Sequence, residues 1–308
     1  MKRTVFRPFM SPRRIPMRVV PALCACLLGC HPGRHATDTR PNTSDSATVQ
    51  VNGTTIFYEA AGAGSVVVLL HTGNLDRRIW DPQFAALAHD HRVIRYDARG
   101  YGRSGRAISP YRGDEDLYAL LRALHIPRAS LVGASQGGRI AIDFALAHPE
   151  MVDRLVLAAP GLSGWEFRHG DTTWLPDARR ARDRGDSAGI ALAWLQQDFM
   201  RPAMERPAVA EALRRIARDN GRFWMDVIRY HGEADQQGDP PALHRTRLLR
   251  APTLLLIGSR DSPDLRELAD TLSASIPNVR RVVFEGAGHL LNLEEPERFT
   301  TLVRAFLH

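Results

Sequence analysis

Cysteine is scarce in this chain, and its few copies lie close together. The three cysteines are Cys24, Cys26 and Cys30, so residues 31–308 contain none. A disulfide framework or a zinc site built from thiolates needs several cysteines distributed over the folded chain. The sequence therefore excludes both for everything that follows residue 30.

Lysine is scarcer still, and the positive charge is unevenly placed. Lys2 is the single lysine, so arginine supplies the other 40 of the 41 basic residues. The first 29 residues contain six of these bases and no acid, and without those six the formal net charge falls from +7 to +1 for residues 30–308. A surface that binds nucleic acid needs its positive charge on the folded domain. We therefore predict no nucleic-acid partner and attribute the arginine content to compositional bias.

Long hydrophobic runs are also lacking, with one short exception near the N-terminus. An apolar run of eleven residues, Val19 to Gly29, follows a basic stretch that ends at Arg18. Such a run is too short to span a bilayer but suits the core of a signal peptide. The segment Leu27-Leu28-Gly29-Cys30 resembles a bacterial lipobox, in which cleavage leaves a lipidated cysteine as the new first residue.

This resemblance implies that residues 1–29 are a lipoprotein-type signal peptide and that Cys30 is lipidated. The protein is then exported to the bacterial cell envelope and held at a membrane by its lipid. An uncleaved anchor and an ordinary secretory signal stay open as alternatives, and Met10 and Met17 are alternative starts. Residues 30–47 are rich in polar residues and lack an apolar period, which predicts a flexible linker.

One stretch near the middle of the chain combines a buried strand, a sharp turn and a helix. Ala129 to Val132 is an apolar run typical of a strand, and Arg139 to Ala147 has helical periodicity. Between them stands Gly133-x-Ser135-x-Gly137, the pattern of a nucleophile elbow, in which a strained turn projects the serine hydroxyl from the sheet. The alternative interpretation is an ordinary glycine-rich turn without a chemical role.

Strands and helices alternate over most of the chain. Asn52-Gly53 lies between two strand-like runs, 48–51 and 54–59, which is a strong signal for an antiparallel hairpin. From Val66 onward, apolar runs alternate with amphipathic helices, a pattern typical of a mostly parallel sheet covered on both faces. The predicted strands after the hairpin are 66–70, 92–96, 129–132, 155–158, 252–258 and 280–284. The expected fold class is therefore α/β, a mostly parallel, doubly wound sheet whose active site lies at the carboxyl ends of the strands.

The alternation breaks between residues 161 and 246, where no strand-like run occurs. Arginine-rich helical stretches occupy this segment, over 177–184, 187–200, 206–220 and 221–232. We interpret it as a helical cap inserted into a core of residues 48–160 and 247–308. Four of the five tryptophans lie in the cap, and they either form its own core or line an apolar substrate pocket. Three of them are candidate substrate-binding residues, namely Trp165, Trp194 and Trp224.

Two residues after other predicted strands complete a catalytic triad with Ser135. A serine nucleophile needs a base, and the base needs an acid that orients it. In an elbow fold these follow in the order serine, acid, histidine. Asp261 follows the strand at 252–258, and His289 follows the last strand. Asp264 is the rival acid one helical turn further on, whereas His71 precedes the nucleophile and is expected to support its own loop.

The oxyanion of a tetrahedral intermediate needs preorganised backbone donors. The N–H of Gln136, directly after the nucleophile, is the first expected donor. The second is the N–H of Gly73, after the strand that ends before His71, and Asn74 is a further candidate for substrate binding. Residues 97–104 are expected to form a glycine-rich loop that braces the site.

Together these motifs resemble those of the α/β-hydrolase superfamily over about residues 48–308. The motifs that carry the likeness are His71-x-Gly73, Asp97-x-Arg99-Gly100-x-Gly102-x-Ser104, Gly133-x-Ser135-x-Gly137-Gly138, Gly258-x-x-Asp261 and Gly286-x-Gly288-His289. The stretch from Leu75 to Asp81 is similar to the capped branch that includes small-ester hydrolases, enol-lactonases and C–C bond hydrolases. Thr72 departs from the superfamily pattern, which usually has glycine at this place.

The resemblance implies a serine hydrolase that cleaves a small carboxylic ester or lactone through an acyl-enzyme on Ser135. This mechanism needs no cofactor and no metal, and its partner is a small-molecule substrate. A C–C bond hydrolase of the same fold, a peptidase and a catalytically inactive binding protein are the alternatives. The pattern indicates neither the acyl or alcohol specificity nor the oligomeric state.

Overall fold

The computed structural model of the chain describes residues 44–229 and 235–308. The predicted signal peptide, Cys30 and the linker up to residue 43 lie outside the described residues. Within the two described ranges, no helix is both long and apolar enough to cross a membrane.

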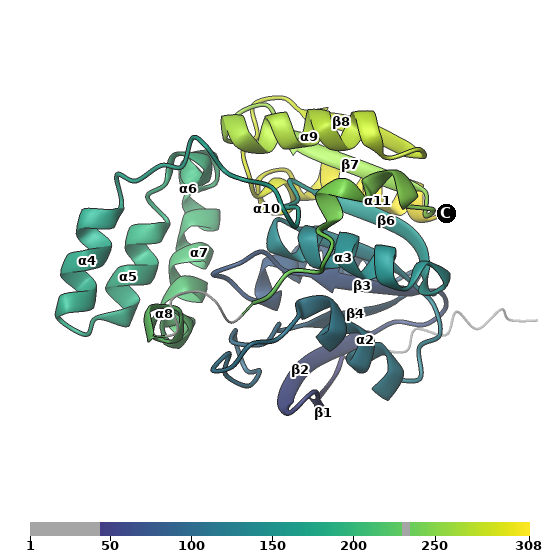
Figure 1. Ribbon diagram of the computed structural model, residues 1–308, viewed down its shortest axis with the longest axis horizontal. Coiled ribbons are helices and arrows are strands. Elements are labelled where there is room, and N and C mark those ends of the chain that lie inside the picture. The colour runs from purple at the N-terminus through teal and green to yellow at the C-terminus, as the bar shows by residue number, and fades with distance from the viewer. Residues whose placement is uncertain (1–43, 230–234) are drawn as a thin grey trace, which may run out of the picture. The chain divides into compact units, whose positions relative to one another are not determined.

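An eight-stranded sheet forms the centre of the domain, in the order β1-β2-β4-β3-β5-β6-β7-β8 (Figure 1). The strands are β1 (Asp45–Val51), β2 (Thr54–Ala61), β3 (Val66–Leu70), β4 (Arg92–Tyr96), β5 (Ala129–Ala134), β6 (Val152–Ala158), β7 (Thr253–Gly258) and β8 (Val279–Phe284). β2 is antiparallel to β1 and to β4, and every other neighbouring pair is parallel. The predicted fold class, a mostly parallel sheet with an antiparallel N-terminal hairpin, is confirmed.

The hairpin turns at the predicted place, but its first strand is longer than predicted. Asn52 and Gly53 both have positive φ angles, 43° and 74°, as a tight hairpin turn requires. β1 begins at Asp45, inside the segment 30–47 that we expected to be a flexible linker, because Asp45 pairs with Ala60 of β2. The side chains of this edge strand are mostly exposed, so they leave no apolar period in the sequence.

Helices cover both faces of the sheet, and alternate residues of each strand point to opposite layers. Outside the cap the α-helices are α1 (Asp81–Leu87), α2 (Gly113–Ala123), α3 (Gln136–Ala147), α9 (Pro263–Ser275), α10 (Leu291–Glu294) and α11 (Pro296–Leu307). Leu131 of β5 belongs to the buried cluster under α2, α3 and α9, whereas Val132 belongs to the cluster on the other face. Parallel strands buried on both faces are therefore continuous apolar runs, which is why the sequence predicts them well.

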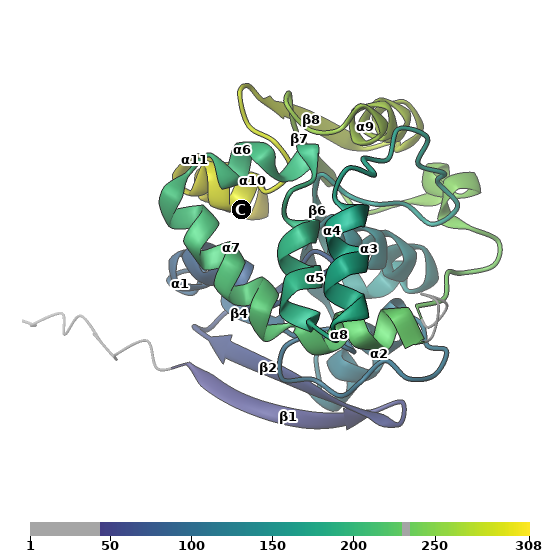
Figure 2. The ribbon, with the colours of Figure 1, turned by 90° about the vertical axis from the view of Figure 1, so that its left-hand side faces the viewer.

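The cap is an insertion between β6 and β7. Its α-helices are α4 (Leu175–Asp183), α5 (Ser187–Trp194), α6 (Arg201–Met204), α7 (Pro207–Asp219) and α8 (Gly221–Arg229). Figure 1 shows α4, α5, α7 and α8 together beyond one end of the strands, and Figure 2 views the molecule from that side. The short 3-10 helices of the chain are η1 (Arg77–Trp80), η2 (Pro149–Met151), η3 (Asp198–Met200), η4 (Ala242–His244) and η5 (Thr246–Leu248).

Two features of the cap differ from the sequence prediction. The helix expected over 187–200 ends at Trp194, because Gln197 has the extended angles φ −60° and ψ 145° that no helix continues through. Residues 235–246 were assigned to the cap but run back over the core, where the fully buried Ala242 joins the same cluster as Phe144 of α3. This return segment contains Gly238 and two prolines and has no periodic signal.

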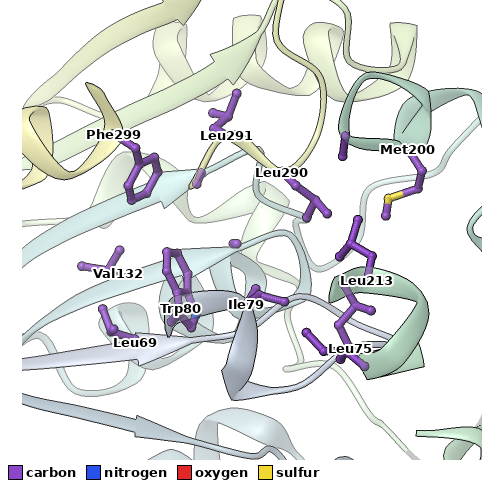
Figure 3. Close-up of a cluster of buried hydrophobic side chains, with 14 of the residues drawn as sticks. Leu69, Leu75, Ile79, Trp80, Val132, Met200, Leu213, Leu290, Leu291 and Phe299 are labelled. Carbon is purple, nitrogen blue, oxygen red and sulfur yellow. The ribbon is translucent and has the colours of Figure 1, made fainter. Parts of the chain in front are cut away.

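The cap and the sheet share one hydrophobic cluster. Phe299 of α11 and Trp80 of η1 pack against the sheet, and the cluster continues to Leu213 of α7 and Met200 of η3 (Figure 3). Asn220 adds a buried polar connection, since its Nδ2 donates to Asp76 Oδ2 at 2.8 Å and its Oδ1 accepts from the N–H of Gly102 at 2.7 Å. The cap is therefore attached to the core by apolar packing and by hydrogen bonds together.

Candidate active site

Ser135 lies on a strained turn between β5 and α3. Its φ of 51° and ψ of −114° are outside the ordinary regions for a residue with a side chain. A Cβ on Gly133 would lie 2.4 Å from the carbonyl oxygen of Gly137, and a Cβ on Gly137 would lie 2.2 Å from the carbonyl oxygen of Leu70. Both flanking positions therefore require glycine, as an elbow of this shape predicts.

His289 and Asp261 form a buried pair that faces the same cavity as Ser135. His289 Nδ1 lies 3.0 Å from Asp261 Oδ2, and the other carboxylate oxygen accepts a hydrogen bond from the N–H of Ser262 at 2.8 Å. The three predicted triad residues all line one cavity of about 630 Å³. An imidazole whose Nδ1–H donates to a carboxylate has Nε2 free to accept a proton, which is the state that a general base needs.

Asp264, the rival acid, has a different structural role. Its carboxylate accepts from the N–H of Arg168 at 3.0 Å and from the N–H of His169 at 2.7 Å, and it also pairs with His169 Nδ1 at 3.0 Å. Burial alone would raise the pKa of Asp264, but these hydrogen bonds bring it below its ordinary value. Asp264 thus anchors the loop of Arg168 and His169, and Asp261 is the acid beside His289.

Glu294 of α10 holds the loop that carries His289, and the sequence analysis missed it. Its two carboxylate oxygens accept from the N–H groups of Gly288 at 2.8 Å and Leu290 at 3.0 Å, on either side of the histidine. Burial raises the pKa of Glu294, although Arg206 lies 3.6 Å away. The sequence did contain one sign of this role, because Glu294 is an acid that lies five residues after His289 at the start of a helical region.

The two residues that carry the expected oxyanion donors are neighbours. A Cβ on Gly73 would lie 2.9 Å from Gln136 Oε1, which places the two predicted donor residues in contact. His71 holds the loop that contains Gly73. Its Nδ1 donates to the carbonyl of Thr72 at 2.7 Å, and its Nε2 accepts from the N–H of Ala98 at 2.9 Å. Burial lowers the pKa of His71, so the imidazole stays neutral in this supporting role.

Two further residues, Tyr101 and Asp235, hold this oxyanion region. The Tyr101 hydroxyl donates to Gln136 Oε1 at 3.0 Å and accepts from the backbone N–H of Asn74. Gln136 Nε2 in turn donates to Asp235 Oδ2 at 2.7 Å, and Arg139 of α3 pairs with the same carboxylate. Asp235 is 99 residues from Gln136 along the chain, so no local pattern could have indicated this contact.

Of the candidate substrate-binding residues, Asn74 and Trp194 line the cavity, and Trp165 and Trp224 do not. Trp224 packs in the cap beside Trp194, with ring centroids 6.3 Å apart. Trp165 is partly buried and packs against the other core cluster, which also contains Phe144 of α3. Trp224 thus fits the interpretation of a cap core, whereas Trp165, which packs on the sheet core, fits neither interpretation.

The cavity has apolar side chains in its wall beside polar ones, and its charged side chains have partners. Apolar walls come from the cap, the loop after β6 and α9, namely Phe167, Trp194, Phe199, Pro263 and Leu265. Arg260 is paired with Glu205 at 2.8 Å, and Asp198 is paired with Arg201. Asp171 accepts from the N–H of Asp198 at 2.9 Å and from Thr173 at 2.8 and 2.6 Å. Within 44–229 and 235–308 no cluster of His, Cys, Asp and Glu could hold a metal ion.

Comparison with known proteins agrees with this geometry. A family described as "alpha/beta hydrolase fold" matches residues 65–296. The chain is 27% identical to 3-oxoadipate enol-lactonase 2 of Acinetobacter baylyi over 81% of this chain and 92% of that one. It is 30% identical to 2-hydroxy-6-oxo-2,4-heptadienoate hydrolase of Pseudomonas putida over 80% of this chain and 90% of that one. The crystal structure of the enol-lactonase from Burkholderia xenovorans LB400 superposes with a TM-score of 0.67 and 27% identity, covering 85% of this chain and 99% of that one.

Proposed function

Because the chain belongs to the α/β-hydrolase family, we propose that it is a serine hydrolase that cleaves a small, uncharged carboxylic ester or lactone. Hydrolase activity is common to its relatives, and the proposal concerns the bond that is cleaved and the residues that cleave it. One observation supports it most strongly. Ser135, on its strained turn, shares a cavity with His289, whose Nδ1 lies 3.0 Å from Asp261.

The proposed reaction proceeds in two halves. His289 Nε2 takes the hydroxyl proton of Ser135 while the serine oxygen attacks the carbonyl carbon of the substrate. The oxyanion that forms is held by the N–H groups of Gln136 and Gly73. The alcohol leaves with the proton from His289, so that an acyl-enzyme remains. Water then attacks the acyl-enzyme with His289 as base, releases the acid and restores Ser135.

The lining of the cavity supports an uncharged substrate. A charged substrate group would meet side chains that already have a partner of opposite charge, since Arg260 pairs with Glu205 and Asp198 pairs with Arg201. Apolar rings line much of the remaining wall, and a cavity of about 630 Å³ suits a small molecule.

Hydrolysis of p-nitrophenyl esters of graded acyl length tests the proposal. We expect the full-length chain, purified in a mild detergent, to hydrolyse short esters and to be labelled once by a fluorophosphonate. Ser135→Ala should lose both properties, whereas Ser262→Ala, which alters a neighbouring hydroxyl in the same cavity, should keep them. Ester hydrolysis that persists in Ser135→Ala would refute the serine mechanism.

The similarity to 2-hydroxy-6-oxo-2,4-heptadienoate hydrolase favours a second candidate, cleavage of a C–C bond next to a carbonyl. Labelling of Ser135 without hydrolysis of any ester or lactone, together with cleavage of a vinylogous 1,5-diketone, would select this candidate.

We also propose export to the bacterial cell envelope with a lipid on Cys30, on the basis of the lipobox-like Leu27-Leu28-Gly29-Cys30. Wild-type protein expressed in a bacterium should incorporate radiolabelled palmitate and partition into the detergent phase, and Cys30→Ser should do neither. Label in Cys30→Ser equal to that in wild type would contradict lipidation at this residue.

A further inference from the structure

Gln197 is a buried amide in the wall of the catalytic cavity, and within the described residues it makes one of its four possible side-chain hydrogen bonds. The residue is only 8% exposed and lies between α5 and η3. Its Nε2 donates to the carbonyl oxygen of Trp194 at 3.3 Å. That carbonyl can only accept, so the orientation of the amide is determined and Oε1 points elsewhere. Among the described residues Oε1 has no hydrogen-bond partner, although Gln197 lines the cavity.

The segment around Gln197 is held firmly beside the catalytic histidine. The carbonyl of Gln197 accepts from the N–H of Met200 at 2.9 Å, and the N–H of Asp198 donates to Asp171 at 2.9 Å. Two residues after Gln197, the ring of Phe199 packs edge-on against the imidazole of His289, with centroids 4.9 Å apart. Gln197 is therefore placed to contact a substrate that is bound for attack by Ser135.

We propose that Gln197 is a substrate-binding residue that selects esters or lactones carrying a hydrogen-bond donor, an amide N–H or a hydroxyl. This inference rests on the proposed serine hydrolysis and specifies its substrate class. An amide oxygen only accepts, so a donor on the substrate satisfies it, whereas an aliphatic substrate removes water from it and leaves it unpaired. A site that binds a polar group rejects the analogue lacking that group more strongly than an apolar pocket rejects an extra methylene.

Two pairs of substrates, each differing only by N–H against CH₂, test this inference. p-Nitrophenyl N-acetylglycinate and p-nitrophenyl levulinate carry the difference on the acyl side. 2-Acetamidoethyl butyrate and 4-oxopentyl butyrate carry it on the alcohol side, and a pH-stat follows their hydrolysis. For each pair the measured quantity is the ratio of kcat/KM for the N–H substrate to kcat/KM for the CH₂ substrate. Comparison of this ratio between enzyme variants cancels the intrinsic reactivity of the esters.

Three variants separate the acceptor from its packing. Gln197→Met has nearly the same volume without the oxygen, and we expect its ratio to fall at least tenfold in one of the two pairs. Gln197→Glu keeps an acceptor oxygen but loses the donor to Trp194, so its ratio should stay within threefold of wild type. Gln196→Met is the matched control, because Gln196 is exposed and lies outside the catalytic cavity. Its ratios should equal those of wild type.

The possible outcomes distinguish this inference from the function on which it rests. If all variants hydrolyse both members of each pair and Gln197→Met changes neither ratio by threefold, Gln197 does not select donors, and the serine mechanism is unaffected. Equal losses on N–H and CH₂ substrates in Gln197→Met would mean a structural role only and would also overturn the inference. If wild type hydrolyses simple p-nitrophenyl esters but none of the four test esters, the inference fails and the proposed function stands, whereas wild type that hydrolyses no ester at all fails both.

Discussion

Replacing Asp261 by asparagine should reverse the tautomer of His289 without altering its position. The carboxylate is fully buried, with Oδ1 accepting from the N–H of Ser262 at 2.8 Å and Oδ2 lying 3.0 Å from His289 Nδ1. In Asp261→Asn the amide oxygen must face Ser262, because the NH₂ group would otherwise oppose another donor. The NH₂ group then faces His289 Nδ1, which must accept. The ring proton moves to Nε2, where it blocks the transfer from Ser135.

The expected loss follows from that blocked transfer. Enforcing the wrong tautomer in a serine triad lowers kcat by about 10⁴-fold, or about 5 kcal/mol of transition-state stabilisation. We expect kcat for a p-nitrophenyl ester to fall by about 10³- to 10⁴-fold in Asp261→Asn, with KM changed by less than about threefold. Asp264→Asn is the matched control. It should keep kcat within about threefold and raise KM, because Asp264 anchors the loop of Arg168 and His169 beside the cavity.

Steady-state kinetics on the two variants decide between the acids, and circular dichroism shows that both are folded. The reasoning is wrong if Asp261→Asn keeps more than a tenth of wild-type kcat. It is equally wrong if Asp264→Asn loses as much kcat as Asp261→Asn does.

Three further predictions concern the oxyanion region, the elbow and acid stability. Tyr101→Phe removes the hydroxyl that holds Gln136 and Asn74, so kcat should fall about tenfold at nearly constant KM; a kcat equal to wild type would show that these contacts do not position the donors. Gly137→Ala puts a Cβ 2.2 Å from the carbonyl oxygen of Leu70, which cannot move freely in the sheet, so a urea titration should show a loss of at least about 3 kcal/mol. An unchanged urea midpoint would contradict the contact. Burial alone would raise the pKa of Asp76, but hydrogen bonds from Arg78 and its charge hold that pKa below the ordinary value. The stability contributed by ionised Asp76 is therefore complete above about pH 4 and is lost as pH falls through the lowered pKa. Between pH 6 and pH 3 the urea midpoint of wild type should fall more than that of Asp76→Asn, and equal falls would refute this.

Strand positions could be predicted closely because burial on both faces leaves a continuous apolar run. Val66–Leu70 has the predicted bounds, and β7 starts one residue after its predicted start at 252. The carboxyl ends of such strands meet at one edge of a parallel sheet, so Ser135, Asp261 and His289 could be grouped from their places alone. Asp45–Ala47 could not be assigned to β1, because an exposed edge strand is held by backbone pairing and carries no apolar pattern.

Contacts between distant segments escaped the sequence analysis. The pairing of Gln136 with Asp235 depends on how the return segment lies on α3, and the sequence of that segment has no period to reveal it. The same limit applies to the tryptophans of the insert. Helical periodicity shows that a ring faces an apolar surface, but it does not tell whether that surface is the cap interior, as for Trp224, or the catalytic cavity, as for Trp194.

The place of the cap in the chain has a consequence for how readily this protein can change. The helices from Leu175 to Arg229 are inserted after β6 and before β7, so they belong to the connection between β6 and the strand that precedes Asp261. The entropy lost in closing a loop grows with the logarithm of its length, and each doubling costs only about 0.6 kcal/mol. A change in the length of the inserted segment alone therefore costs assembly of the triad little, provided that the packing of Leu213 and Met200 into the shared cluster is kept. Trp194 of the cavity wall lies on this inserted segment, whereas Ser135, Asp261 and His289 lie on the core.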